Sequence, residues 1–162
     1  MRRLAITLSV LAAVAFATGL SARAADFSGK WAPDADKNPA PMTGSTGGAT
    51  GGNRSGGRGP AGPMTITMDA KTMKIERQNA NGTTAQTYNL DGSDSTNATG
   101  RGGDRVSNAK WDSTGAKLVI TTKATQAGMA DAVSSYYMDG ADLVVENTTP
   151  NGPVKTYYKK GS

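Results

Sequence analysis

The chain has 162 residues, of which 18 are Lys or Arg and 13 are Asp or Glu, so its formal net charge is +5. It contains neither cysteine nor histidine. The absence of histidine excludes Ser-His-Asp and Cys-His catalysis and the usual zinc and non-haem iron sites. Because there are no disulfides, the stability of the fold depends on one hydrophobic core. The chain is long enough to form such a core.

Residues 1–24 have the layout of a secretory signal peptide. Arg2 and Arg3 supply a positive start, a long apolar run follows, and the small residues Ala22 and Ala24 lie where signal peptidase recognises them. The apolar run is close to membrane-spanning length, so an uncleaved anchor is the alternative. The polar sequence behind the cleavage site favours cleavage after Ala24. We therefore expect an exported protein, periplasmic or secreted, with no membrane span once the signal is removed.

Removal of the signal also changes the charge balance. Three basic residues, Arg2, Arg3 and Arg23, lie within it, so the rest of the chain carries a net charge of only +2. The basic character of the whole chain therefore predicts no nucleic-acid partner.

A segment poor in apolar residues follows the first candidate strand. Residues 33–63 are rich in Gly, Pro, Ser and Thr and contain one large apolar side chain, Met42. Such a segment buries too little surface to offset the entropy of ordering it. We expect a flexible insert between the first and second strands of a single domain that spans residues 25–162.

From Met64 onward the sequence shows short alternating runs separated by turn signals, with no helical periodicity. Asp and Gly recur at the same place in four of these runs, and both residues favour tight turns. Each of the four, including YNLDGSDS at 88–95, is therefore predicted to form a β-hairpin. The predicted strands are 27–32, 64–68, 73–79, 83–90, 94–98, 105–111, 117–124, 132–138, 143–149 and 154–159.

These strands need one buried face, and pairing across each tight turn predicts which side chains form it. The predicted inward residues are Ile66, Met68, Met73, Ile75, Tyr88, Leu90, Ala109, Trp111, Leu118, Ile120, Tyr136, Met138, Leu143 and Val145. An antiparallel meander with one apolar face either closes into a barrel or folds into a sandwich. The sequential connections favour an all-β, up-and-down barrel of eight to ten strands.

In such a meander alternate turns lie at the same rim. The four Asp-containing turns are predicted to share one rim, and the looser connections and the insert share the other. The inward positions near the looser rim are small or polar: Arg77, Ser107, Thr122, Ser134 and Asn147. Two interpretations stay open: these residues line a ligand-binding mouth, or they are the solvated end of a narrow, filled barrel.

The motif FSGKW at residues 27–31 places Gly29 and Trp31 at the start of the first strand. This Gly-x-Trp resembles the motif that opens lipocalins and related calycin barrels, and also short secreted bacterial proteins that begin F-S-G-x-W. The resemblance implies a lipocalin-like barrel whose long first loop lies at the open end.

The resemblance also implies a structural plug at the closed end. There Trp31 fills the barrel, a basic residue of the last strand packs over it, and Gly29 allows the tight approach. Lys159 or Lys160 is in position for the basic residue, and Trp111 lies near the same rim.

The other motifs do not fit their sequence context. GRGPAG at 57–62 matches a dinucleotide-binding pattern but has no strand before it and no helix after it. DADKN at 34–38 begins like a calcium loop, but Pro39 stands where that loop needs Gly. The carboxylates lie chiefly in turns and form no visible acid–base pair. We therefore expect no metal, no cofactor and no enzyme activity.

Two functions remain. The first is a monomeric, extracytoplasmic, non-catalytic barrel that binds a small, partly apolar molecule through its open end. The alternative is a filled barrel that serves as a structural or envelope-associated module without a small-molecule ligand. An enzyme of unrecognised type is a distant third.

Overall fold

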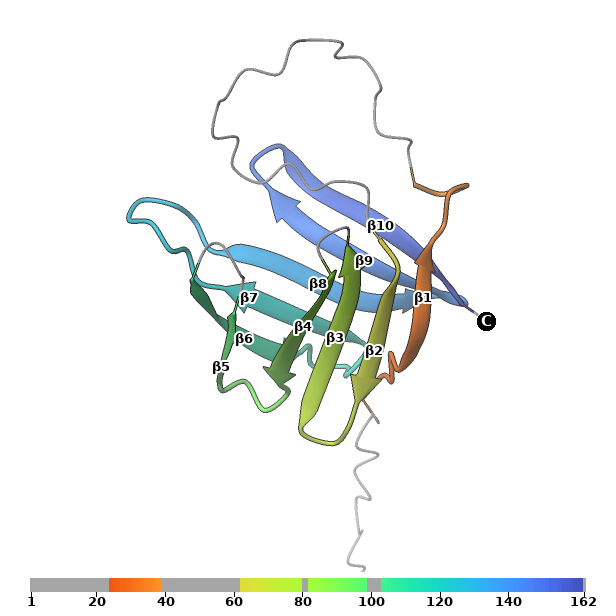
Figure 1. Ribbon diagram of the computed structural model, residues 1–162, viewed down its shortest axis with the longest axis horizontal. Helices are drawn as coiled ribbons and strands as arrows, with labels where there is room; N and C mark the ends of the chain where they lie inside the picture. Colours follow the sequence, from red (N-terminus) through yellow and green to blue (C-terminus); the bar gives the residue numbers. More distant parts are fainter. Residues whose placement is uncertain (1–23, 39–61, 80–81, 99–102, 162) are drawn as a thin grey trace, which may run out of the picture.

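The computed structural model describes residues 24–38, 62–79, 82–98 and 103–161, and in these residues it contains ten β-strands and no helix (Figure 1). The strands are β1 (Gly29–Pro33), β2 (Met64–Met68), β3 (Thr72–Asn79), β4 (Gly82–Asn89), β5 (Asp94–Ala98), β6 (Asp104–Trp111), β7 (Lys117–Thr122), β8 (Ala132–Asp139), β9 (Asp142–Thr149) and β10 (Gly152–Lys160).

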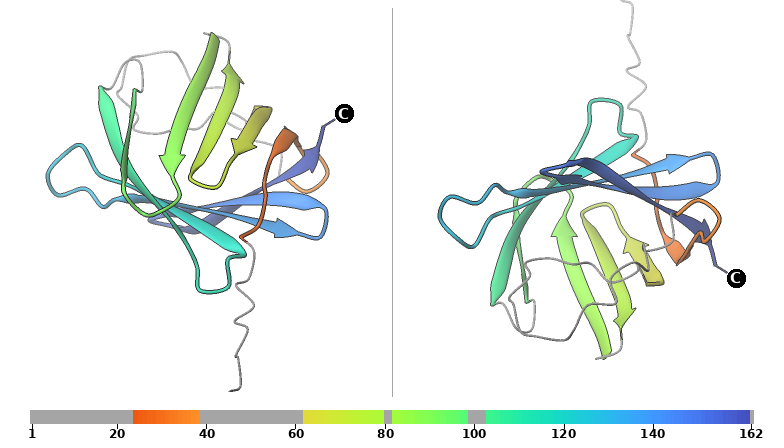
Figure 2. Two further views of the ribbon diagram at one scale, coloured as in Figure 1. Left: turned by 90° about the horizontal axis from the view of Figure 1, so that it is seen from below. Right: turned by 90° about the horizontal axis from the view of Figure 1, so that it is seen from above.

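The strands form one antiparallel sheet in the order β4-β3-β2-β1-β10-β9-β8-β7-β6-β5. Pairing of β1 with β10 joins the beginning and end of the meander, and β4 and β5 also contact each other. The sheet therefore curls into a nearly closed barrel, in which β2–β4 lie across the interior from β6–β9 (Figure 2). The predicted all-β, up-and-down barrel is confirmed, and the sandwich is excluded.

Aspartate side chains build the tight turns at one rim. Asp69 Oδ1 accepts hydrogen bonds from the amides of Lys71 and Thr72, both at 2.7 Å. Asp112 Oδ1 accepts from the amides of Ala116 at 3.0 Å and Lys117 at 3.2 Å. These bonds explain locally why Asp recurs in the turns.

One of the four predicted hairpins is wrong in its pairing. β4 and β5 follow each other through the turn at 90–93, but they share no backbone ladder and stand at the two ends of the sheet order. Asn89, Ser95 and Asn97 instead bridge the two strands through their side chains. Short polar side chains compete for backbone hydrogen bonds, and here they take the place of a ladder.

The core occupies the barrel interior. Most of the predicted inward residues are at most 5% exposed, and Met73, Ala109, Leu118 and Leu143 are fully buried. Met138 is an exception: it is 37% exposed because it lies at the end of β8 beside a turn. The core also contains residues outside the predicted inward set: Phe27, Trp31, Met64 and Tyr158.

The N-terminal segment before β1 closes the tight-turn rim. The Ala25 amide donates a hydrogen bond of 2.9 Å to the Gly115 carbonyl in the β6–β7 turn. Phe27 is fully buried, and its ring centroid lies 5.6 Å from that of Trp111. Phe27, which the sequence analysis assigned only to a strand, is therefore the main plug of this end.

Residues 34–38 pack on the outer face of β9 and β10. Asp34 is only 1% exposed, and Lys37 Nζ forms an ion pair of 2.5 Å with Asp142. The carboxamide of Asn38 donates to the Tyr157 carbonyl at 2.9 Å and accepts from the Tyr157 amide at 2.8 Å. Residues 33–38 of the predicted insert therefore contact the barrel, and residues 39–61 of that insert lie outside the described residues.

Candidate functional site

Four of the five predicted open-end residues form two cross-strand pairs on the inner wall. Ser107 of β6 is directly opposite Thr122 of β7, with 2.9 Å between their hydroxyl oxygens. Ser134 of β8 is opposite Asn147 of β9, and its hydroxyl donates to Asn147 Oδ1 at 2.7 Å. The structure therefore brings these side chains together as a polar layer near the looser rim.

Arg77 also points into the barrel, from β3. Its Nη2 donates to the hydroxyl oxygen of Tyr136 on β8 at 3.4 Å. Because β3 and β8 are not neighbours in the sheet, this hydrogen bond spans the interior of the barrel. Tyr158 of β10 also interacts favourably with the guanidinium, and both tyrosines are almost fully buried. Arg77, Tyr136 and Tyr158 are hereafter called the arginine–tyrosine cluster.

The guanidinium keeps its charge in this position. Burial by itself lowers the pKa of Arg77, but electrostatic attraction and hydrogen bonding to Tyr136 and Tyr158 outweigh it, so the pKa is raised above its ordinary value. Among the described residues no carboxylate forms an ion pair with Arg77. The inner wall thus presents a positive charge whose neighbours are the hydroxyl groups of Tyr136 and Tyr158.

The contact of the two tyrosines with Arg77 was not predicted from the sequence. Tyr136 was predicted to be a core residue, and Tyr158 received no inward role. The alternation of Thr156, Tyr158 and Lys160 along β10 is the signal that places Tyr158 on the inner face, since Lys160 is paired with the inward Trp31.

Around the arginine–tyrosine cluster the barrel is filled: Leu118 is paired with Tyr136, and Leu143 with Tyr158. Ile66 and Ile75 are 1% exposed, and Met73, Leu118 and Leu143 are fully buried. Side chains packed this closely leave no room for a long apolar chain between them. The core beside the polar layer is therefore packed and offers no deep apolar cavity.

The predicted plug residues occupy two different places. Trp31 is 2% exposed, and its indole Nε1 donates to the Phe27 carbonyl at 2.8 Å. Its backbone is level with Met64 and Arg77, while Trp111 lies at the tight-turn rim beside Phe27. The two indoles thus belong to one core cluster but lie at different depths.

Lys160, and not Lys159, lies over Trp31. Lys160 Nζ is 5.9 Å from the centre of the Trp31 ring, and a Cβ at Gly29 would lie 3.2 Å from Lys160 Cε. Gly29 also has a φ of +144°, which disfavours other residues. Lys159 instead contacts Asp34 Oδ1 at 3.0 Å and Asp36 Oδ2 at 3.1 Å outside the barrel. The assignment of Lys159 to the plug is corrected because successive side chains of a strand face opposite sides.

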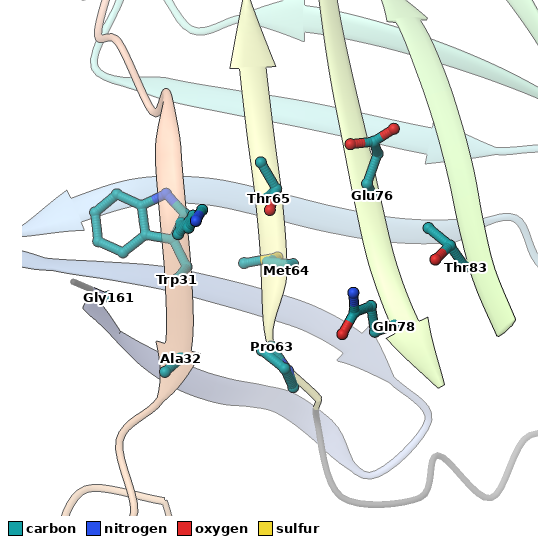
Figure 3. A pocket seen from close by; sticks show the side chains of 10 residues that line it. Trp31, Ala32, Pro63, Met64, Thr65, Glu76, Gln78, Thr83 and Gly161 are labelled. Carbon is teal, nitrogen blue, oxygen red and sulfur yellow. The ribbon is translucent and has the colours of Figure 1, made fainter. Parts of the chain in front are cut away.

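Two surface pockets lie away from the polar layer. One, of about 460 Å³, lies over the outer side of β1–β4, where Thr65, Glu76, Gln78 and Thr83 line it (Figure 3). The other, of about 660 Å³, lies at the tight-turn rim between residues 70–72, residues 89–91 and Trp111. Neither pocket is lined by the predicted open-end residues.

Across residues 24–38, 62–79, 82–98 and 103–161, acidic side chains nowhere gather in threes to offer a metal site. The same residues include no helix with the length and hydropathy needed to span a bilayer.

Comparison with known proteins identifies the fold. No family model matches the chain, and no curated protein does. Among solved structures, the chain is similar to a REP1-NXSQ fatty acid transporter, with 17% identity and a TM-score of 0.52 over 62% of this chain and 70% of the other. A Schistosoma mansoni fatty acid binding protein in complex with arachidonic acid gives 20% identity and a TM-score of 0.51, with coverages of 62% and 70%.

A third similar structure is a mutant of the fluorescent protein UnaG, with 16% identity, a TM-score of 0.51 and coverages of 62% and 71%. At these identities the likeness shows the fold and not the function. The chain therefore shares the antiparallel β-barrel fold of these structures.

Proposed function

We propose that the chain is a non-catalytic barrel that binds a small molecule with an anionic group and a short apolar part at its looser rim. The observation that carries this proposal is the positive charge of Arg77 on the inner wall, in contact with Tyr136 and with no carboxylate partner among the described residues. A guanidinium without a carboxylate partner is suited to bind the carboxylate of a ligand, because charge-assisted hydrogen bonds are stronger than hydrogen bonds between neutral groups.

The polar layer supports the same proposal. Ser107, Thr122, Ser134 and Asn147 supply donors and acceptors around the rim, and these fix the orientation of a bound polar group. The similarity of the fold to a fatty acid transporter and to a fatty acid binding protein supports a small-molecule ligand in general. The packed core restricts the class of ligand further, because Leu118 and Leu143 occupy the space that a long hydrocarbon chain would need.

A filled structural module is the second candidate, and one observation favours it. The two pockets of about 460 and 660 Å³ both lie outside the barrel interior. In that case the interactions of Arg77 serve only to satisfy a buried guanidinium. The module predicts no binding at the polar layer, which separates it from the first proposal.

Export is part of the proposal. The positively charged start, the apolar run and the small residues before Ala25 support a signal peptide. Packing of the chain against the barrel from Ala25 onward supports a mature protein that begins there.

Calorimetric titration with straight-chain carboxylates from acetate to octanoate tests binding. Each methylene group that the mouth buries adds about 0.8 kcal/mol, so affinity should rise with chain length and then level off where the packed core begins. Arg77→Gln should weaken binding by about 1.5–3 kcal/mol, the value of a hydrogen bond to a charged group.

The matched control is Lys74→Gln, on the same strand but on the outer face, where Lys74 pairs with Glu76. It should bind like the wild type. Equal affinity for hexanoate and 1-hexanol would contradict the role of Arg77, and an undiminished rise in affinity beyond octanoate would contradict the filled core.

A further inference from the structure

One junction of the barrel differs from all the others. Every other pair of neighbouring strands shares a backbone ladder, whereas β4 and β5 contact each other without one. This junction is called the seam. Separation of the seam breaks a few side-chain bonds, while separation of any other junction breaks several backbone bonds.

The carboxamide of Asn97 closes the seam. Its Oδ1 accepts from the Thr87 amide at 2.7 Å, and its Nδ2 donates to the Thr87 carbonyl at 2.9 Å. One side chain on β5 thus satisfies both backbone groups of a residue on β4, as a neighbouring strand would. Ser95 adds one bond by accepting from the Asn89 amide at 2.8 Å. Both Asn97 and Ser95 are 7% exposed.

These bonds hold only the half of the seam near the tight-turn rim. Toward the looser rim β4 continues with residues 82–85, all of which are exposed, although Thr84 is paired with Arg77 and shares its inward direction. The seam is therefore held together at Thr87 and Asn89 and widens beside Arg77. The two hydrogen bonds of Asn97 to Thr87 are called the Asn97 clip. The turn at 90–93 connects the two strands at the closed end.

We propose that the seam is a gate: the barrel opens there by release of the Asn97 clip, with β4 and β5 separating about the turn at 90–93. Opening gives lateral access to the inner wall beside Arg77 and Ser107. Its role in ligand entry rests on the proposed function, whereas the opening itself requires no ligand.

The chain contains a matched control for the clip. Asn38 makes the same pair of hydrogen bonds to Tyr157 on the outer edge of β10, at 2.9 and 2.8 Å. There, however, the backbone ladder between β9 and β10 stands behind it. Loss of Asn38 therefore frees a strand edge without opening the barrel, while loss of Asn97 opens the seam.

Amide hydrogen exchange in Asn97→Ala and Asn38→Ala tests the gate without any ligand. Loss of two hydrogen bonds should raise the exchange rates of Thr87 and Asn89 on the order of tenfold in Asn97→Ala. In Asn38→Ala the local increase should be limited to Tyr157. Ile120 in β7 reports global unfolding, so its exchange rate should rise only by the loss of overall stability, and to a similar extent in the two variants. Seam amides that exchange in Asn97→Ala as slowly as in the wild type would overturn the proposal.

A buried thiol measures access to the interior. The chain has no cysteine, and Ser107 is 3% exposed on the inner wall of β6, so Ser107→Cys places a single probe behind the seam. Its modification by methyl methanethiosulfonate, followed by intact mass, should accelerate on the order of tenfold when Asn97→Ala is added, and within twofold when Asn38→Ala is added.

The more conservative Asn97→Asp keeps the acceptor for the Thr87 amide but loses the donor to its carbonyl, and it should also accelerate labelling. Equal labelling rates in all backgrounds would mean that the thiol is reached through the open rim, and the gate would be wrong. Because neither readout uses a ligand, failure of carboxylate binding would contradict the proposed function and leave the gate standing.

Discussion

Replacement of Trp31 by alanine tests how the core and the opening motif of the chain are connected. The indole is 2% exposed, lies in the core cluster and donates to the Phe27 carbonyl at 2.8 Å. Deletion of a buried aromatic side chain costs about 3–5 kcal/mol, and an orphaned Phe27 carbonyl adds about 1 kcal/mol. We expect Trp31→Ala to lose roughly 4–6 kcal/mol, a large share of the 5–15 kcal/mol typical of a domain.

Urea denaturation followed by circular dichroism measures this loss. Trp31→Phe keeps most of the ring volume but loses the indole N–H, so it should cost only about 1–2 kcal/mol. Met129→Ala is the control, because Met129 is 56% exposed and should change stability by less than about 0.5 kcal/mol. A loss under about 1 kcal/mol for Trp31→Ala would refute the assignment of Trp31 to the core and, with it, the value of the Gly-x-Trp resemblance.

Burial alone would raise the pKa of Asp34, but hydrogen bonds from Lys159 and the Asp36 amide outweigh it and hold the pKa below its ordinary 3.8. The ionised carboxylate therefore stabilises the folded protein fully above that value, and this contribution is lost as the pH falls through the folded pKa. Asp34→Asn should flatten the decline of the denaturation midpoint below about pH 4. Deletion of residues 42–60 should leave a folded barrel, with a change in closure free energy of about 1 kcal/mol, and an unfolded product by circular dichroism would contradict the predicted insert. Intact mass of the exported protein should show Ala25 as its first residue, whereas retention of residues 1–24 would contradict the predicted cleavage.

The barrel itself was predictable from local patterns. Alternation along each strand and Asp or Gly in each turn determine the hairpins, because turn chemistry acts between residues a few positions apart, as in Asp69 and Asp112. Sequential antiparallel connections then leave few ways to bury one face. The same patterns wrongly predicted a backbone ladder between β4 and β5. There the side chains of Asn89, Ser95 and Asn97 form hydrogen bonds in place of the ladder.

The site was only partly predictable. Alternation placed Ser107 opposite Thr122 and Ser134 opposite Asn147, because such pairs follow from register alone. The contact of Arg77 with Tyr136 joins strands that are not neighbours, and local periodicity carries no information about it.

Two other misses have the same physical origin in tertiary structure. Phe27 is buried because the segment before β1 passes over the tight-turn rim, and no strand pattern describes that path. Lys159 and Lys160 differ by one position, and only the pairing of Trp31 with Lys160 decides which of them faces the indole.

The central claim is that Arg77 on the inner wall recognises an anionic group, and nuclear magnetic resonance of the protein with hexanoate tests it most directly. We expect hexanoate to shift the side-chain Nε–H signal of Arg77 and the amides of Ser107 and Asn147 with a single saturable curve. The same concentration of 1-hexanol should shift them far less. If hexanoate leaves the Arg77 signal unmoved while the barrel stays folded, Arg77 is only a satisfied interior residue, and the filled-barrel module is the correct account.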